Sequence, residues 1–120
     1  NYVRPGLTLK EVNIFARDFM AAECIAKGLI KDKEEISRVY YHSVSHQLGL
    51  DTHDPDLDRR QGVLQPGMVI TVEPGLYFKE LNIGVRVEDD VLITEDGSEC
   101  LSSDIIKEIN DIESVMRGNI

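Results

Sequence analysis

A long helical period near the start of the chain is the feature that most constrains its fold. In the stretch PGLTLKEV, Thr8 is followed three residues later by Glu11, which is the capping-box pattern of a helix N-terminus. Apolar side chains then recur every three or four residues, and Gly28 marks the expected end of the helix. The predicted buried face consists of Leu9, Val12, Phe15, Phe19, Ala22, Ile25 or Ala26, and Leu29.

From Gly62 onward the pattern changes to that of β-strands. The Pro-Gly pairs at 66–67 and 74–75 are turn signals, and they bracket a β-branched run at 69–72 that we expect to be a strand. The EDG triplet at 95–97 predicts a hairpin turn. A helical segment followed by strands and turns indicates an α+β domain.

A further strand is expected in the stretch IGVRVEDDVLIT. Val85 and Val87 alternate there with Arg86 and Glu88, and successive side chains of a strand point to opposite faces. The two valines are therefore predicted to face the core, and the two charged residues to face a pocket.

Two other segments have weaker helical patterns. The charged stretch KDKEEISRVYY predicts a short helix with a solvated face. The tail DIIKEINDIESVM is ambiguous, and we expect an extended piece followed by a short helix from about Asn110.

Composition excludes several classes of protein. The 120 residues, 42% hydrophobic and 29% charged, are those of one ordinary globular domain covering 1–120. A net charge of −9 argues against nucleic acid or an anionic membrane as partner. No apolar run approaches the roughly 20 residues of a membrane span, and the N-terminal stretch lacks the layout of a signal peptide, so we expect a cytoplasmic location. Cys24 and Cys100 are expected to be free or buried thiols.

All three histidines of the chain lie within the thirteen residues HSVSHQLGLDTHD. His42 and His46 are four residues apart, a spacing that on a helix would present both rings to one metal ion, as in HExxH motifs. Here Ser43 follows the first histidine and Gly49 interrupts soon afterwards, so a strand or a loop is expected. On an extended segment the two histidines would share a face.

Two interpretations of these polar residues stay open at this point. Each histidine can be an unrelated half-buried residue, Glu73 a solvent-facing residue at a strand end, and Glu88 the partner of Arg86 in a surface ion pair. The other interpretation is a functional cluster, which three histidines in one segment together with isolated carboxylates on strands favour.

Three stretches in this order, SHQLGLDTHD, LQPGMVITVEPGLYF and GVRVEDDVLIT, resemble the C-terminal part of the Xaa-Pro aminopeptidases (aminopeptidase P). These are pita-bread metallopeptidases of family M24, which also include prolidase and methionine aminopeptidase. The resemblance runs from about Pro5 to Met116. It implies the C-terminal half of a pita-bread fold, with helices packed on a mostly antiparallel curved sheet.

The resemblance also implies a metal centre. Family members hold two divalent ions, most often manganese, with cobalt, zinc or iron as alternatives, and cleave the N-terminal residue from peptides with proline in second position by means of a metal-bound hydroxide. The family's metal ligands fall on His46, Glu73 and Glu88, with Glu88 bridging both ions.

The remaining site residues follow from the same motifs. His42 and His53 match histidines that line the substrate pocket and stabilise the carbonyl as it becomes tetrahedral. Glu73 also helps to activate the attacking water, and Arg86 matches the basic residue that supports the ligands. The implied partner is a proline-containing peptide.

One part of the family pattern does not occur in this sequence. The two aspartate ligands of the family come from a DxG…D segment ahead of these motifs. The aspartates that follow the histidine motif do not match it; they are Asp51, Asp54, Asp56 and Asp58. We therefore expect a fragment that is inactive or nearly so alone.

Two alternatives to this interpretation remain. The chain can be a non-catalytic binding or dimerisation module on the half-fold, or the fragment can belong to a prolidase (Xaa-Pro dipeptidase). A module freed from catalysis has no chemical reason to keep the three histidines and two glutamates together, which favours the peptidase. A half-fold leaves apolar faces exposed, so we also expect a homodimer.

Overall fold

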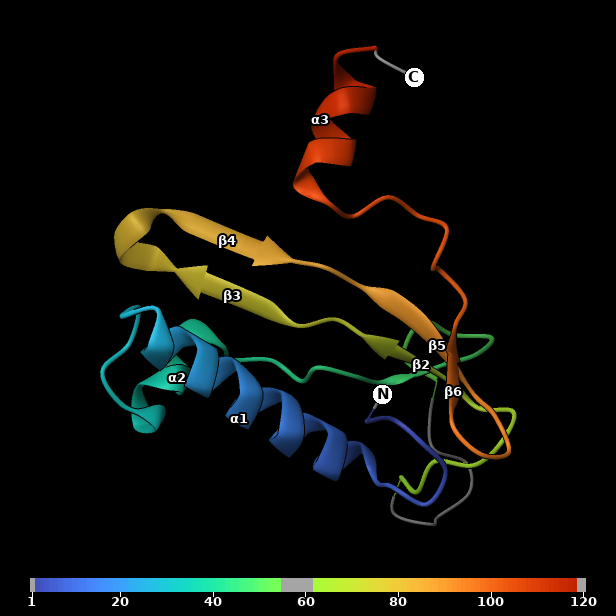
Figure 1. Ribbon diagram of the computed structural model, residues 1–120. Coiled ribbons are helices and arrows are strands. Elements are labelled where there is room, and N and C mark those ends of the chain that lie inside the picture. The colour runs from blue at the N-terminus through green and yellow to red at the C-terminus, as the bar shows by residue number, and fades with distance from the viewer. Residues whose placement is uncertain (1, 55–61, 119–120) are drawn as a thin grey trace.

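The computed structural model describes residues 2–54 and 62–118, and Figure 1 shows how its elements are arranged. Helices and strands occur together in one chain, as the α+β prediction required. The helical elements are α1 (Leu9–Ala26), the 3-10 turns η1 (Lys33–Glu35) and η2 (Lys79–Leu81), α2 (Ile36–Val39) and α3 (Ile109–Met116). The strands are β1 (Gln47–Leu48), β2 (Val69–Val72), β3 (Gly75–Phe78), β4 (Ile83–Arg86), β5 (Asp89–Ile93) and β6 (Ser98–Cys100).

Two antiparallel sheets follow one another along the same pair of chain segments. The first has the strand order β1-β2-β5-β6, and the second contains β3 and β4. The chain passes directly from β2 to β3 and from β4 to β5, so the second sheet continues the middle of the first, and α1 runs beneath it (Figure 1). Every described strand pair is antiparallel, as predicted.

The core lies between the two N-terminal helices and the four-stranded sheet. Ile36 of α2, Ile70 of β2 and Ile93 of β5 are at most 1% exposed. Cys24 is buried in the same cluster and unpaired, and Cys100 is also a free thiol, as predicted. None of the described helices is long and apolar enough to cross a bilayer.

The start and end of the long helix are as predicted. Thr8 and Glu11 form a complete capping box, and Gly28 adopts a left-handed backbone with φ of 69° just after the helix. The short helix predicted within 31–41 is present as η1 and α2, and the tail helix begins at Ile109.

The predicted buried face of α1 was largely wrong. Val12 is buried as predicted, but Phe15 and Phe19 are 45% and 59% exposed. The other buried residues of the helix, which were not predicted, are Met20, Ala21 and Cys24. The helix has two neighbouring apolar stripes, and a period alone does not say which one meets the sheet. The exposed stripe lines an open apolar groove against β3 and β4.

Two expectations about the strands were also wrong. Pro74-Gly75 does not make a turn: Gly75 is the first residue of β3, and the strand continues there. The single strand expected in IGVRVEDDVLIT is divided into β4 and β5, which belong to different sheets. Val85 and Val87 line the apolar groove on the side opposite the charged residues, but both are exposed. The EDG triplet connects β5 to β6, and Ile93 pairs with Ser98 across it, as predicted.

Candidate metal centre

The candidate site lies where the first sheet passes into the second. Val72 pairs with Asp89 at the end of one sheet, and Gly75 pairs with Arg86 at the start of the other. Two residues on each strand lie between these pairs, so the same register places Glu73 opposite Glu88. Directly opposed residues of antiparallel strands have Cβ atoms about 5 Å apart. Like charges in such a position destabilise a sheet unless something neutralises them.

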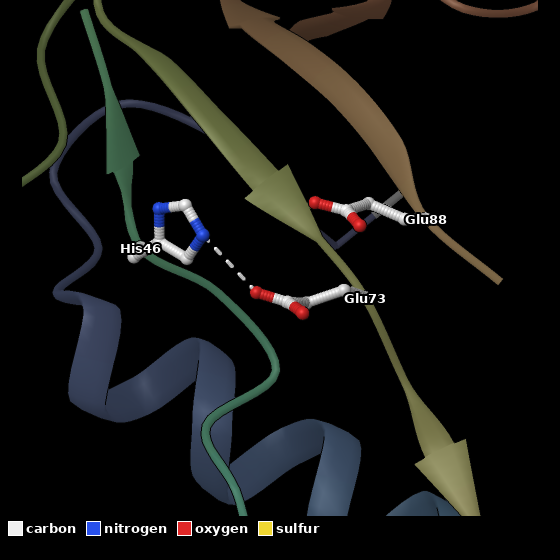
Figure 2. Close-up of side chains that lie close together, drawn as sticks. All are labelled: His46, Glu73 and Glu88. Carbon is white, nitrogen blue, oxygen red and sulfur yellow. Dashed lines mark ion pairs between the residues drawn. The ribbon is translucent and has the colours of Figure 1, made fainter. Parts of the chain in front are cut away.

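The third member of the cluster is His46, from the segment that leads into β1, which pairs with β2 on the edge opposite β5. His46 immediately precedes β1, and the Glu73 N–H donates to the Val44 carbonyl at 2.7 Å, which aligns the histidine segment along β2. Ligand-type atoms of His46, Glu73 and Glu88 all lie within 4.8 Å of one another (Figure 2). The fold thus brings together the three residues expected to bind metal.

The tautomer of His46 is set by a backbone contact. Its Nδ1 lies 3.0 Å from the Gln47 carbonyl, which can only accept, so Nδ1 carries a proton. Nε2 lies 3.2 Å from Oε1 of Glu73, and a dashed line marks this pair in Figure 2. When the His46 ring is neutral, its Nε2 and the Glu73 Oε1 are both acceptors. A cation shared between them is the group that two such acceptors would bind.

The donor set fits a divalent cation. One imidazole nitrogen and two carboxylates are the ligand types that suit manganese, iron, cobalt or zinc, and no thiolate is among them. A cation between the facing carboxylates would also remove their mutual repulsion.

Arg86 approaches the same carboxylate from the other side. Its Nη1 lies 3.8 Å from Oε2 of Glu73, and the arginine side chain is half exposed. The two oxygens of Glu73 therefore face different groups, with Oε1 directed toward His46 and Oε2 toward Arg86. This arrangement leaves the carboxylate little freedom to rotate.

The other two histidines line a pocket beside the cluster. His42 Nδ1 lies 2.8 Å from the Ser43 carbonyl and Nε2 lies 3.0 Å from the Tyr77 hydroxyl, so this ring is held by the protein and does not join the three ligands. His53 packs edge-on against His46 with ring centroids 4.4 Å apart. The pocket has a volume of about 480 Å³, and its lining includes all the predicted site residues except Glu88.

Sequence reasoning missed Tyr77 and the reason for Gly75. A Cβ on Gly75 would lie 2.6 Å from the Tyr77 hydroxyl oxygen and 2.9 Å from His42 Nε2. The glycine is therefore required because the His42–Tyr77 hydrogen bond occupies that space. The available signal is the Pro-Gly pair inside a strand pattern, which by its composition predicts a turn.

Burial affects one further group beside the pocket. Tyr40 packs edge-on against His42, with ring centroids 5.3 Å apart. Burial raises the pKa of the Tyr40 hydroxyl; Arg17 opposes this shift and Glu73 adds to it. Tyr40 is consequently a neutral, protonated neighbour of His42.

Comparison with known proteins identifies the family. The family model described as metallopeptidase family M24 matches residues 1–95. The chain belongs to family M24. Among curated relatives, it is 37% identical to the Xaa-Pro aminopeptidase of Escherichia coli K12, over 94% of this chain and 30% of that protein. The predicted family is therefore confirmed.

Solved structures agree in fold. A candidate aminopeptidase P from Bacillus anthracis superposes with a TM-score of 0.90 at 53% identity, covering 98% of this chain and 28% of that one. Zinc-substituted E. coli aminopeptidase P in complex with product gives a TM-score of 0.80 at 35% identity, over 99% of this chain and 31% of that one. The fold is that of the aminopeptidase P pita-bread domain, as predicted, and this M24 chain spans less than a third of these relatives.

Proposed function

We propose that residues 1–120 are the second half of the catalytic domain of a metal-dependent Xaa-Pro aminopeptidase. The whole enzyme would remove the N-terminal residue from peptides with proline in second position. The observation that carries this proposal is the convergence of His46, Glu73 and Glu88 beside a pocket that contains two more histidines and an arginine.

The ligand cluster would hold the metal ions of the enzyme. We assign His46, Glu73 and Glu88 to two divalent cations, with manganese the first choice and cobalt, zinc and iron as alternatives. When bound, such ions lower the pKa of the attacking water and polarise the scissile carbonyl. Glu88 lies opposite Glu73 and is the most exposed of the three, and the family resemblance would give it the role of contacting both ions.

The remaining residues would handle the substrate and the proton. Glu73 takes a proton from the attacking water, and Arg86 holds the Oε2 side of that carboxylate. His42 and His53 face the pocket and would stabilise the negative charge that develops on the peptide carbonyl oxygen. In its protonated form, His42 would donate from Nε2, in place of accepting from Tyr77.

Manganese titration of the purified chain by calorimetry tests the metal assignment. Wild-type protein should bind, and Glu88→Ala should weaken binding by more than the roughly 10–100-fold that loss of an outer-shell partner costs. Glu95→Ala, which removes an exposed carboxylate in the β5–β6 turn, is the matched control and should bind like wild type. Equal binding by all three proteins would remove the metal assignment.

Peptide cleavage by the full-length protein tests the reaction. With manganese present, a tripeptide with proline in second position should be cleaved and the same tripeptide with alanine there should not. Cleavage of Xaa-Pro dipeptides alone would identify a prolidase, and metal binding without any cleavage would support a non-catalytic module. The cytoplasmic location stays a prediction from the sequence.

We further propose that the isolated chain is a homodimer joined through its apolar groove. The groove has a volume of about 550 Å³, and its walls, from α1, β3 and β4, are almost entirely apolar. All four residues of β4 are exposed, and β3 is the only strand paired to it within the described chain. An open edge strand is a template for pairing, and antiparallel pairing of two copies of β4 would create a two-fold axis.

A further inference from the structure

One buried hydroxyl contacts two of the three candidate ligands. Thr71 lies in β2 and is only 2% exposed. Its Oγ1 accepts a hydrogen bond from the His46 N–H at 3.1 Å and lies 3.3 Å from Oε1 of Glu73. Its own N–H donates to the His46 carbonyl at 3.0 Å, so the two residues are joined by both backbone and side chain.

The direction of these hydrogen bonds follows from the groups involved. The His46 N–H can only donate, so the Thr71 oxygen must accept from it. The hydroxyl proton is then available for Glu73, and it points at Oε1, the same oxygen that faces His46 Nε2 at 3.2 Å. The hydroxyl therefore occupies one side of Oε1 and leaves the other side for the cluster.

Threonine at this position is hard to explain by packing alone. The other three residues of β2 are valine or isoleucine, and Ile70 beside Thr71 is fully buried. A buried hydroxyl costs free energy unless it is hydrogen-bonded, and valine would fill the same volume without that requirement. The polar atom is explained by what it contacts, since its donor and an acceptor lone pair are both engaged by the site.

We propose that Thr71 is a positioning residue for the metal centre, whose hydroxyl couples the His46 backbone to the Glu73 carboxylate and so fixes the separation of these two ligands. The inference rests on the proposed metal-binding function and deepens it. Loss of such an outer-shell partner typically weakens metal affinity about 10–100-fold. Without the hydroxyl, Oε1 of Glu73 loses one of the contacts that orient it, and ordering the carboxylate more tightly on binding opposes metal affinity.

The test compares variants that differ in one hydroxyl. Thr71→Val keeps the β-branched shape and removes the hydroxyl, while Thr71→Ser keeps the hydroxyl. Thr94→Val is the matched control, because the Thr94 hydroxyl also donates to a carboxylate, Oδ1 of Asp96, at 3.4 Å but in the β5–β6 turn. Each protein is titrated with Mn²⁺ by calorimetry, its Mn²⁺ EPR spectrum is recorded, and exchange of the His46 amide is followed by NMR in metal-free protein.

Thr71→Val should weaken Mn²⁺ binding about 10–100-fold, change the EPR spectrum and speed exchange of the His46 amide. Thr71→Ser should restore all three properties, and Thr94→Val should change none. Wild-type affinity together with wild-type amide protection in Thr71→Val would overturn the inference.

Two other outcomes are possible: the Thr71→Val variant does not fold, or the wild-type chain does not bind Mn²⁺. If Thr71→Val does not fold, Thr71→Cys replaces it, because a thiol is a poor hydrogen-bond donor of similar size to the serine hydroxyl. Wild-type affinity in Thr71→Cys would then overturn the inference. If the isolated chain binds no Mn²⁺, it is the half-site expected without the family's two aspartate ligands, and the coupling by Thr71 is then judged by the His46 amide in metal-free protein.

Discussion

Among single residues, Gly75 is the one whose substitution should affect packing most clearly. A methyl group there would overlap the Tyr77 hydroxyl and the His42 ring. We expect Gly75→Ala to lower the free energy of unfolding by about 1–3 kcal/mol, the usual cost of overpacking. Urea unfolding followed by circular dichroism measures the change.

Gly97→Ala is the control for this variant. The nearest atom to a Cβ at Gly97 is the Thr94 hydroxyl oxygen at 3.8 Å, which is an ordinary contact. Its effect should stay within roughly 0.5 kcal/mol, as for most surface substitutions. If Gly75→Ala proved as stable as Gly97→Ala, the space around His42 and Tyr77 would be larger than the structure indicates.

Residue patterns predicted the cluster better than they predicted its surroundings. His46, Glu73 and Glu88 were identified because they stand in family motifs, and strand alternation placed Glu88 and Arg86 on one side. Tyr77 was missed because its contact with His42 joins residues 35 positions apart, which no local pattern reports. Long-range proximity of this kind is fixed by sheet register and not by neighbouring sequence.

Among the elements, the segment that leads to α3 is attached to the start of β5 by backbone hydrogen bonds of Asp90 and by one carboxylate. Asp89 at the start of β5 accepts hydrogen bonds from the Ser102 hydroxyl at 2.6 Å and the Lys107 ammonium at 2.8 Å. The Cys100 thiol lies 3.4 Å from the same oxygen. Burial raises the pKa of Asp89, but hydrogen bonds from Lys107, Ser102 and Cys100 outweigh it and hold the pKa below its usual value.

This lowered pKa predicts an acid-sensitive attachment. Between the folded and unfolded pKa values of Asp89, the unfolded state binds more protons, so stability rises with pH. The contribution is fully present above the unfolded value of about 3.9 and is lost as pH falls through the folded value. Unfolding free energies measured from pH 5 down to about pH 2 should show this loss.

Asp89→Asn should be less stable than wild type at neutral pH and should show a shallower decline with acid. Asp18→Asn, on the exposed side of α1, is the control and should follow the wild-type curve. Identical slopes for wild type and Asp89→Asn would show that other carboxylates account for the acid sensitivity.

The N-terminal cap of α1 is the second element-level prediction. The Thr8 hydroxyl oxygen accepts from the Glu11 N–H at 3.1 Å, and a Glu11 carboxylate oxygen accepts from the Thr8 N–H at 2.7 Å. Thr8→Ala should cost about 1 kcal/mol of stability, whereas Thr52→Ala, at an exposed loop position, should cost little. Thermal unfolding compares the two, and equal melting temperatures would mean that the cap contributes nothing.

The sequence predicted where the helices begin and end, but it did not predict which side of each element is buried. The cap at Thr8 and the stop at Gly28 depend on a few adjacent residues, so sequence identifies them. Which apolar stripe of α1 meets the sheet depends on the path of β2 and β5 much later in the chain. The division of β4 from β5 likewise depends on which partner strand each half pairs with.

For the whole molecule, the exposed apolar surface is the dominant feature. Phe19 of α1 and Val85 of β4 are 59% and 61% exposed, and both line the groove. A second apolar surface lies on α3, where Ile109 is 74% exposed, and Figure 1 shows this helix standing away from the sheets. Surfaces of this kind are where proteins associate.

The charge of the molecule modulates any such association. At a net charge of −9, two copies repel each other, and salt screens the repulsion over a Debye length of about 10 Å at 0.1 M. The proposed dimer should therefore tighten as salt is raised, the opposite of an interface held by ion pairs.

Light scattering and sedimentation of the isolated chain over a range of concentrations test the dimer and its location together. Wild-type protein should be a dimer at high concentration. Val85→Asp should be monomeric, because an unpaired carboxylate in an apolar interface costs several kcal/mol, or more than about 100-fold in affinity. Ile109→Asp introduces the same charge on α3 and should remain dimeric. A wild-type monomer at high concentration would refute the dimer, and loss of association only in Ile109→Asp would move the interface from the groove to α3.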